Sequence, residues 1–354
     1  MNTSIGKRGY TILKEELTSS QIYAIRQELT VKPFISGDYG AAPSPFPVYC
    51  ESKRKLYLPR YFGLQKYGKP TTDKIDDGEK VTMDFPLSLK PKQLPIADAF
   101  LKAAEDVGGG IISVPCGYGK TVIGLYLASK LGVKTLVVVH KEFLVNQWKE
   151  RIKQFLPYAR VGKIQGNKIF VDGYDIVIGM LQSISMKEYP ESVFEKFGFV
   201  IYDECHHLGA EVFSKALPKL TTTYMLGLSA TPDRKDGLSK VFEYFIGDYV
   251  YKQTEKESRK VIVNIIQLDN RYSYCKEIQN YNKKLNMPRM ITNICEFEAR
   301  NILIIDLIKL IIKDESRQII ILSDRKYQLN ELYKFIDTNK ICSVGYYVGG
   351  MKEI

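Results

Sequence analysis

The sequence predicts an α/β fold whose core is a parallel sheet, and two observations support this prediction. Between residues 90 and 250, short and continuously apolar runs alternate with segments long enough to form helices. A glycine-rich segment, residues 115–121, follows the first of these runs and opens the helix after it. Apolar strands separated by helices are typical of a parallel sheet that is covered on both faces.

Residues 1–88 differ from the rest and are predicted to form a small accessory domain of mixed structure. The stretch 41–47 contains three prolines, which excludes a regular helix or a central strand there. Two short β-like runs follow at 48–50 and 55–59, and the polar, acidic segment 71–80 is expected to be a loop.

A basic and aromatic group within this domain suggests contact with a nucleic-acid strand. Its members are Lys53, Arg54, Lys55, Tyr57, Arg60, Tyr61 and Tyr67. Cations pair with phosphates and aromatic rings stack on bases, so such a mixture suits single-stranded nucleic acid. A solvated basic face is the alternative.

Residues 89–250 are predicted to form one α/β domain. Strands are expected at 111–114, 136–139, 175–179, 199–202 and 224–228, and helices at 119–131 and through Trp148 to residue 155. Trp148 shares an apolar helix face with Leu144 and Ile152. We therefore expect it to pack in the core rather than to stack on a base.

Residues 251–295 are predicted to be a connection, and residues 296–354 to begin a second α/β domain. In the latter, helices are expected at 301–312 and 327–336, and strands at 318–323 and 343–347. A parallel sheet of two strands would leave much apolar surface uncovered. The sequence therefore suggests that this second domain is incomplete in the chain.

The overall composition is that of an ordinary globular protein, with 45% apolar and 26% charged residues among 354. No run of 18 apolar residues occurs, and residues 1–17 lack the apolar centre of a signal peptide, so we expect a soluble intracellular protein without a membrane partner. The six cysteines form no CxxC pair, which argues against a disulfide framework or a zinc site. The net charge of +11 favours a polyanionic partner.

The segment after the first strand has the pattern of a phosphate-binding loop. It consists of Pro115, Cys116, Gly117, Tyr118, Gly119, Lys120 and Thr121. Its glycines let backbone N–H groups point at phosphate oxygens, and the following helix adds a favourable dipole. Lys120 is expected to reach the β- and γ-phosphates of ATP, and the Thr121 hydroxyl to ligate Mg²⁺. The general pattern has glycine at position 114, where this chain has valine.

Two adjacent acids, Asp203 and Glu204, end the apolar strand 199–202. Asp203 is placed to hold Mg²⁺ opposite Thr121, and Glu204 to orient and deprotonate the attacking water. By themselves such acids fit a solvated turn equally well. Their position after a phosphate-binding loop, in a succession of strands and helices, favours the catalytic interpretation.

A third segment, residues 229–232 with the sequence Ser-Ala-Thr-Pro, also follows an apolar strand. Its small hydroxyl side chains are suited to linking the carboxylates to a moving surface. A turn ended by proline is the alternative for this segment considered alone.

In order and spacing, the three segments resemble the motifs of superfamily 2 helicases and translocases. The matches are a P-loop of the form PxGxGKT, a DExH box at 203–206 and a SATP motif at 229–232, with weaker matches at Gln93, 139–148, 178–183, 320–325 and 347–350. The resemblance covers residues 89–354. It is strongest to the XPB- and UvsW-like branch, which includes transcript-release helicases of poxviruses and other large DNA viruses.

This resemblance implies two RecA-like P-loop NTPase domains that clamp ATP between them, with nucleic acid crossing both. It makes Gln93 an adenine-reading residue, and gives the nucleotide chemistry to Lys120, Asp203 and Glu204, with Thr121 and Asp203 on Mg²⁺. His206, Ser229 and Thr231 would couple hydrolysis to strand movement, with His206 at the interface between the two domains.

One departure from the family pattern concerns arginines. The family ends in a motif of the form QxxGRxxR, which completes the ATP site from the second domain, and no such run is found here. An arginine finger contributes about 10³–10⁵ in rate in related phosphoryl transfer. We therefore expect the chain alone to bind ATP but to hydrolyse it poorly.

The sequence thus predicts an ATP-dependent helicase or translocase that uses ATP and Mg²⁺ and acts on nucleic acid, with DNA favoured over RNA. Transcription or replication proteins are further expected partners. The alternatives are an annealing or scaffold subunit with weak ATPase activity, and a motor subunit of a larger transcription or restriction complex. The resemblance and the Lys-, Ile- and Tyr-rich composition suggest a viral source, which would place the protein in the host cytoplasm or the virion.

Overall fold

The computed structural model describes residues 1–33, 44–209, 211–230, 237–253, 262–267, 273–349 and 351. The chain divides into two compact units, Met1–Ser258 and Arg259–Ile354. Each is described by itself. No helix among these residues has both the length and the apolar character needed to cross a membrane.

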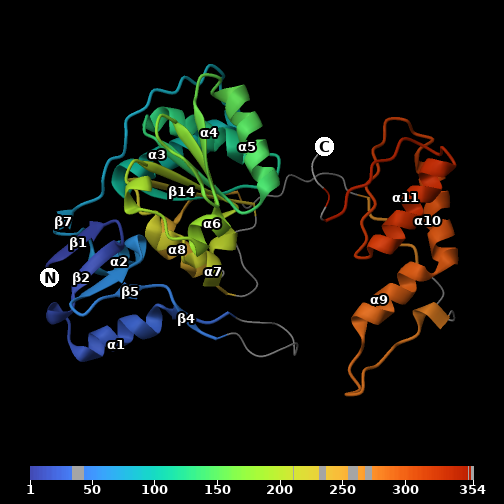
Figure 1. Ribbon diagram of the computed structural model, residues 1–354, viewed down its shortest axis with the longest axis horizontal. Coiled ribbons are helices and arrows are strands. Elements are labelled where there is room, and N and C mark those ends of the chain that lie inside the picture. The colour runs from blue at the N-terminus through green and yellow to red at the C-terminus, as the bar shows by residue number, and fades with distance from the viewer. Residues whose placement is uncertain are drawn as a thin grey trace. The chain divides into compact units, whose positions relative to one another are not determined.

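An eight-stranded sheet forms the centre of the first unit (Figure 1). Its strands lie in the order β11 (Lys168–Phe170), β10 (Val161–Gln165), β12 (Ile176–Met180), β9 (Thr135–Val139), β13 (Phe199–Asp203), β14 (Tyr224–Ser229), β8 (Gly109–Ser113) and β15 (Tyr249–Lys252). All neighbouring pairs are parallel except β10 with β11. The predicted parallel α/β fold and its five predicted strands are therefore confirmed.

Helices cover both faces of this sheet, because successive side chains of a strand point to opposite sides. They are α3 (Leu94–Asp106), α4 (Lys120–Leu131), α5 (Glu142–Phe155), α6 (Leu181–Met186), α7 (Glu211–Ser214) and α8 (Ser239–Ile246). Phe199 and Ile201 of β13 join one core cluster with residues of α3, α4 and α5. Val200 and Tyr202 join the other, with residues of α6 and α8 and of the N-terminal region.

The N-terminal region of the first unit has its own five-stranded sheet. The order is β5 (Cys50–Glu51), β6 (Lys55–Leu58), β2 (Gly9–Leu13), β1 (Thr3–Gly6) and β7 (Thr72–Asp73), with helices α1 (Ser19–Glu28) and α2 (Arg60–Tyr67) and a pair β3 (Thr30–Val31) and β4 (Phe46–Pro47). Thr18 caps α1 with a capping box. Short 3-10 helices lie at Lys14–Glu16, Pro91–Gln93, Glu191–Val193, Cys205–Gly209, Leu217–Lys219 and Ser273–Cys275.

Part of the basic and aromatic group predicted to contact nucleic acid is structural. Arg60 is only 8% exposed, and its guanidinium donates to the backbone oxygens of Thr222 (2.6 Å) and Val107 (3.1 Å), which belong to the large-sheet region. Tyr61 is also buried, and Tyr67 stacks on Tyr10. The hypothesis was wrong for Arg60 and Tyr61, because this part of α2 packs inward. Tyr67 is half-buried, and Lys53, Arg54 and Lys55 are exposed, so a contact with nucleic acid stays a prediction for these residues.

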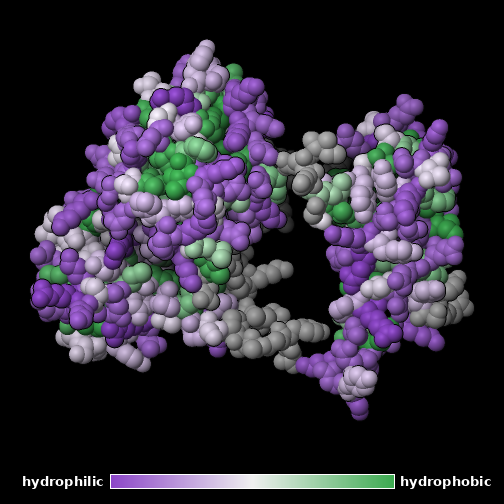
Figure 2. Space-filling view, viewed as in Figure 1, coloured by the Kyte–Doolittle hydropathy of each residue, from purple (hydrophilic) through white to green (hydrophobic). Residues whose placement is uncertain are grey.

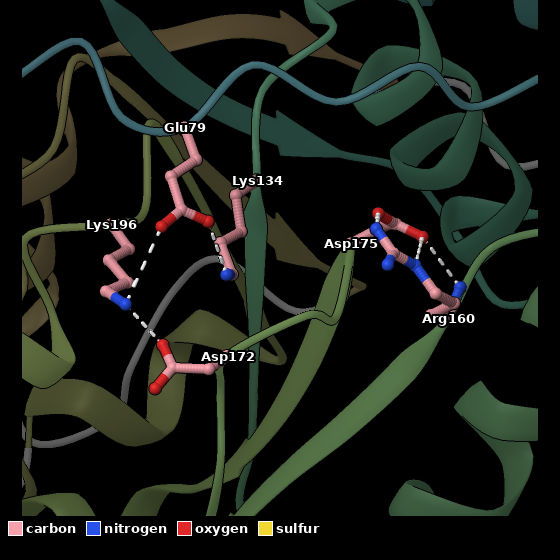
Figure 3. Close-up of polar contacts among 6 residues, drawn as sticks. All are labelled: Glu79, Lys134, Arg160, Asp172, Asp175 and Lys196. Carbon is pink, nitrogen blue, oxygen red and sulfur yellow. Dashed lines mark hydrogen bonds and ion pairs between the residues drawn. The ribbon is translucent and has the colours of Figure 1, made fainter.

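A network of charged side chains lies where strands β9, β12 and β13 begin (Figure 3). The Lys134 ammonium, 1% exposed, lies 2.6 Å from a carboxylate oxygen of Glu79. Lys196 contacts both Glu79 and Asp172. Arg160 binds Asp175 through two side-chain hydrogen bonds and one from its backbone N–H. These contacts tie the chain before the sheet to the amino-terminal edge of the strands.

The second unit contains α9 (Met287–Glu296), α10 (Glu298–Ile311) and α11 (Lys326–Thr338), which confirms the two predicted helices. The strands predicted at 318–323 and 343–347 were wrong, because neither described segment forms a strand. Both segments line one pocket, and Ile319, Ile321, Val344 and Tyr346 are among its lining residues. Their apolar side chains face a cavity, and no ladder of backbone hydrogen bonds joins these two described segments. On the face shown in Figure 2, hydrophilic residues cover most of the surface of each unit.

Candidate nucleotide-binding site

The predicted phosphate-binding loop joins β8 to α4, which begins at Lys120 with Thr121 as its second residue. Gly117 and Gly119 have φ values of 86° and 83°, in the left-handed region that favours glycine. A Cβ atom on Gly119 would lie 2.4 Å from Nε2 of Gln93. Both the backbone conformation and the close approach of Gln93 therefore require glycine at this point of the loop.

Gln93 is 4% exposed and connects the loop to the segment before α3. Its Nε2 donates to the backbone oxygen of Tyr118 (2.9 Å), and its Oε1 accepts from the backbone N–H of Lys90 (2.9 Å). The Lys92 ammonium lies 4.3 Å from the centre of the Tyr118 ring. The structure thus brings Gln93 to the phosphate-binding loop, and its reading of adenine stays a prediction.

Asp203 and Glu204 lie at the carboxyl end of β13, on the same edge of the sheet as the loop. The Lys120 ammonium lies 3.4 Å from Oε1 of Glu204. The other carboxylate oxygen of Glu204, Oε2, lies 3.5 Å from Nδ1 of His206 and 3.5 Å from the backbone nitrogen of Ala230. Glu204 also has a φ of 49°, a conformation that costs about 1–3 kcal/mol in residues other than glycine and is concentrated at functional sites.

The Asp203 carboxyl group is mostly enclosed by protein. Burial raises its pKa, and the neighbouring charge of Glu204 acts in the same direction. A hydrogen bond from Nε1 of Trp148 to Oδ2 of Asp203, 2.8 Å long, opposes this rise, as does the charge of Lys120. The prediction that Trp148 packs in the core is confirmed, since it is 1% exposed. Its bond to Asp203 was missed, although a buried indole N–H signals that an acceptor is near.

The predicted coupling residues His206 and Ser229 are in contact. Nδ1 of His206 lies 3.0 Å from Oγ of Ser229, which is fully buried at the end of β14. Because His206 also lies beside Glu204, the carboxylate and the Ser229 segment are connected through one imidazole. The third predicted residue, Thr231, lies outside the described residues.

The three histidines of the chain lie together, which the sequence analysis did not predict. The ring of His207 lies 3.9 Å from that of His140 and 4.4 Å from that of His206, measured between centroids. Burial lowers the pKa of His140, and the positive charge of Lys141 adds to this effect. His140 directly follows β9, so it reaches the same sheet edge as the DExH box.

The chain is similar in sequence to several known proteins. The family described as "Type III restriction enzyme, res subunit" matches residues 86–234. L396 of Acanthamoeba polyphaga mimivirus, which carries the name of an ATP-dependent RNA helicase, is 35% identical over 365 residues that cover the whole of this chain and 70% of that protein. The DNA 3'-5' translocase XPB2 of Sulfurisphaera tokodaii is 32% identical over 203 residues, 56% of this chain and 44% of that protein.

Among solved structures, the UvsW helicase from bacteriophage T4 aligns with a TM-score of 0.49 and 17% identity over 71% of this chain and all of that chain. The relation to L396 extends over the entire sequence, including the P-loop, the DExH box and the Ser229 segment. The chain therefore belongs to the superfamily 2 helicases, and it is an ATP-hydrolysing helicase or translocase.

Proposed function

We propose that the protein is a DNA motor that couples ATP hydrolysis at the P-loop site to movement along a duplex. The observation that carries this proposal is the meeting of three motifs at one sheet edge: Lys120 reaches Glu204, and Glu204 reaches the Ser229 segment through His206. A site that only stored nucleotide would not need a carboxylate connected in this way. The relative XPB2, whose name makes it a DNA translocase, supports DNA as the track.

Each residue has a distinct role in the proposed hydrolysis. Lys120 and the N–H groups of the loop bind the phosphates, and Gln93 reads the adenine. Glu204 accepts a proton from the water that attacks the γ-phosphorus, and the bond from that phosphorus to the β-phosphate oxygen breaks, so that ADP and inorganic phosphate leave. Lys120 and His206 lie beside the two oxygens of Glu204 and orient them. A change at Glu204 during turnover then passes through His206 to Ser229 and to Thr231, the next hydroxyl residue of the motif.

The donor set fits Mg²⁺. Asp203 and Glu204 place two carboxyl groups beside one ammonium, and burial raises the pKa of Asp203 because its charge is poorly solvated. A divalent cation on Asp203 and the Thr121 hydroxyl would relieve this penalty, since both are oxygen ligands of the kind Mg²⁺ prefers. When bound, Mg²⁺ supplies positive charge that neutralises the phosphates.

The nucleic-acid contact is proposed to be mainly electrostatic. The chain carries a net charge of +11, and phosphate contacts give binding that depends strongly on salt and weakly on sequence. Its viral relatives support an intracellular place of action, in the host cytoplasm or the virion. The match to a restriction-enzyme subunit favours one further possibility, that this motor works within a larger transcription or restriction assembly.

Displacement of a fluorescent third strand from a DNA triplex tests the proposal, with a forked DNA and an RNA duplex of equal length run in parallel. We expect ATP-dependent release of the third strand by the protein and none by Glu204→Gln. Activity on the RNA substrate alone would contradict DNA as the track. ATP turnover that no nucleic acid accelerates would contradict the motor itself.

A further inference from the structure

Trp148 connects two parts of the nucleotide-binding site, although it belongs to neither the P-loop nor the DExH box and only ends the weaker match at 139–148. It is 1% exposed on α5 and is the only tryptophan of the chain. Its Nε1 donates to Oδ2 of Asp203 at 2.8 Å. Its ring atom Cη2 lies 3.4 Å from the position that a Cβ atom on Gly124 would take, so the ring packs directly on α4, the helix that begins with Lys120.

The chemistry of the indole gives this bond a direction. An indole N–H donates one hydrogen bond and accepts none, and a buried one is satisfied only by a fixed acceptor. Here the acceptor is a carboxylate, so the bond is of the stronger charge-assisted kind. Because the ring is buried and packs on α4, its N–H group is held in place, and the bond restricts rotation of the Asp203 carboxylate.

We propose that Trp148 is the positioning residue for Asp203, holding its carboxylate in the orientation that receives the Mg²⁺ accompanying ATP. This inference rests on the proposed function, in which Asp203 is a ligand of that ion. Trp148 touches neither nucleotide nor metal, and it acts through Asp203. Outer partners of metal ligands typically change metal affinity about 10- to 100-fold when they are removed.

The variant Trp148→Phe keeps an aromatic ring on α4 and removes only the N–H donor. Mg²⁺ should increase the binding of a fluorescent ATP analogue to the protein. We expect the Mg²⁺ concentration that gives half of this increase to be about 10-fold higher in the variant than in wild type. Affinity for the same nucleotide in excess chelator should stay unchanged, because the loop and Lys120 are intact. The matched control is Phe100→Leu, a fully buried aromatic of the same core cluster that makes no polar contact with the site.

If both variants lose Mg²⁺ affinity equally, the effect of Trp148 is one of core packing and the inference is wrong. It is also wrong if Trp148→Phe keeps the wild-type Mg²⁺ dependence. If wild-type protein binds ATP and Mg²⁺ in the expected way but moves along no nucleic acid, the proposed function fails and the inference stands.

A second measurement needs no turnover and no folded Trp148 variant. With one tryptophan, a ¹⁵N-labelled sample shows a single indole N–H signal. In Asp203→Asn the acceptor becomes neutral, so we expect the resonance of the indole proton to shift upfield relative to wild type. The control Asp248→Asn, at an exposed site, should leave the chemical shift of this proton unchanged. An indole signal that ignores Asp203→Asn would show that the bond does not form and would overturn the inference.

Discussion

Glu204 occupies an unusual position at the residue scale, because its backbone is left-handed and its two oxygens have different neighbours. Oε1 lies near Lys120, and Oε2 lies near His206 and the backbone of Ala230. The sequence predicted Glu204 as the base and His206 and Ser229 as coupling residues. It could not predict that a single imidazole stands between the carboxylate and the serine, since this depends on the turn after β13.

His206 and Ser229 should therefore act together as one unit, because their side chains are in contact. We expect His206→Ala and Ser229→Ala each to reduce the stimulation of ATP hydrolysis by DNA, and the double variant to reduce it no further than the stronger single one. Contacting residues couple in this way, whereas independent ones have additive effects. Steady-state ATPase rates of the four proteins with and without DNA measure the coupling. Additive losses would mean that the two residues act separately.

Trp148 and Arg60 show where prediction from residues reached its limit. Both have a polar end on an apolar or amphipathic body. The sequence predicted core packing for Trp148 and a contact with nucleic acid for Arg60, and it predicted a hydrogen-bond partner for neither. The acceptors, Asp203 for Trp148 and the backbone near β14 for Arg60, lie more than 50 residues away in the chain. Tertiary packing determines such distant partners. Arg60, which the sequence suggested as a phosphate contact, therefore proves to join two regions of the first unit by hydrogen bonds.

At the scale of elements, five of the eight strands of the large sheet were predictable, because each has an apolar run that is buried on both faces. Strands β10 and β11 at one edge and β15 at the other were missed. Lys163 and Gln165 interrupt the apolar pattern of β10, and no residue of β11 or β15 is fully buried. The second unit shows the opposite failure. Apolar runs at 318–323 and 343–347 predicted strands, but a run becomes a strand only where a neighbour supplies ladder hydrogen bonds.

The amino-terminal edge of the large sheet depends on Glu79, which neutralises the buried ammonium of Lys134. We expect Glu79→Gln to lower the free energy of unfolding by about 1–3 kcal/mol, because it leaves a buried donor without its charged acceptor. Urea denaturation followed by circular dichroism measures this change. The matched control, Glu188→Gln, removes an exposed carboxylate from Lys219 and should change little. Equal effects of the two variants would argue against a special role of this edge.

Asp175 makes the same edge sensitive to acid. Burial opposes ionisation of Asp175, but the hydrogen bonds from the side chain and backbone of Arg160 outweigh it and lower the pKa of the carboxyl group. A lowered pKa in the folded protein gives stability that is present above the unfolded pKa of about 3.9 and is lost as the pH falls through the folded value. We expect Asp175→Asn to be less stable than wild type at pH 7 and the difference to shrink below about pH 4. A difference in urea midpoint that stays constant with pH would contradict this.

At the scale of the whole molecule, the excess of positive charge should determine how the protein holds nucleic acid. Reversing Lys53, Arg54 and Lys55 to glutamate lowers the net charge by six, from +11 to +5. If these exposed residues bind phosphates, DNA affinity falls, and the slope of log affinity against log salt decreases by about 0.9 for each phosphate that the variant no longer neutralises. Reversal of Lys102, Lys130 and Lys149, exposed on α3, α4 and α5, is the control with equal charge change. Equal effects of the two sets of substitutions would indicate that the net charge of the protein attracts DNA and that residues 53–55 form no local binding site.

In the proposed motor, DNA accelerates a hydrolysis step that Glu204 performs. The most direct test is the rate of ATP hydrolysis by this chain with and without duplex DNA, compared with that of Glu204→Gln, while fluorescent nucleotide binding confirms that both proteins hold ATP. We predict that DNA increases the wild-type rate, whatever its absolute size, and that Glu204→Gln abolishes the increase while retaining ATP binding. A DNA-stimulated rate that survives this substitution would show that Glu204 does not perform the hydrolysis step.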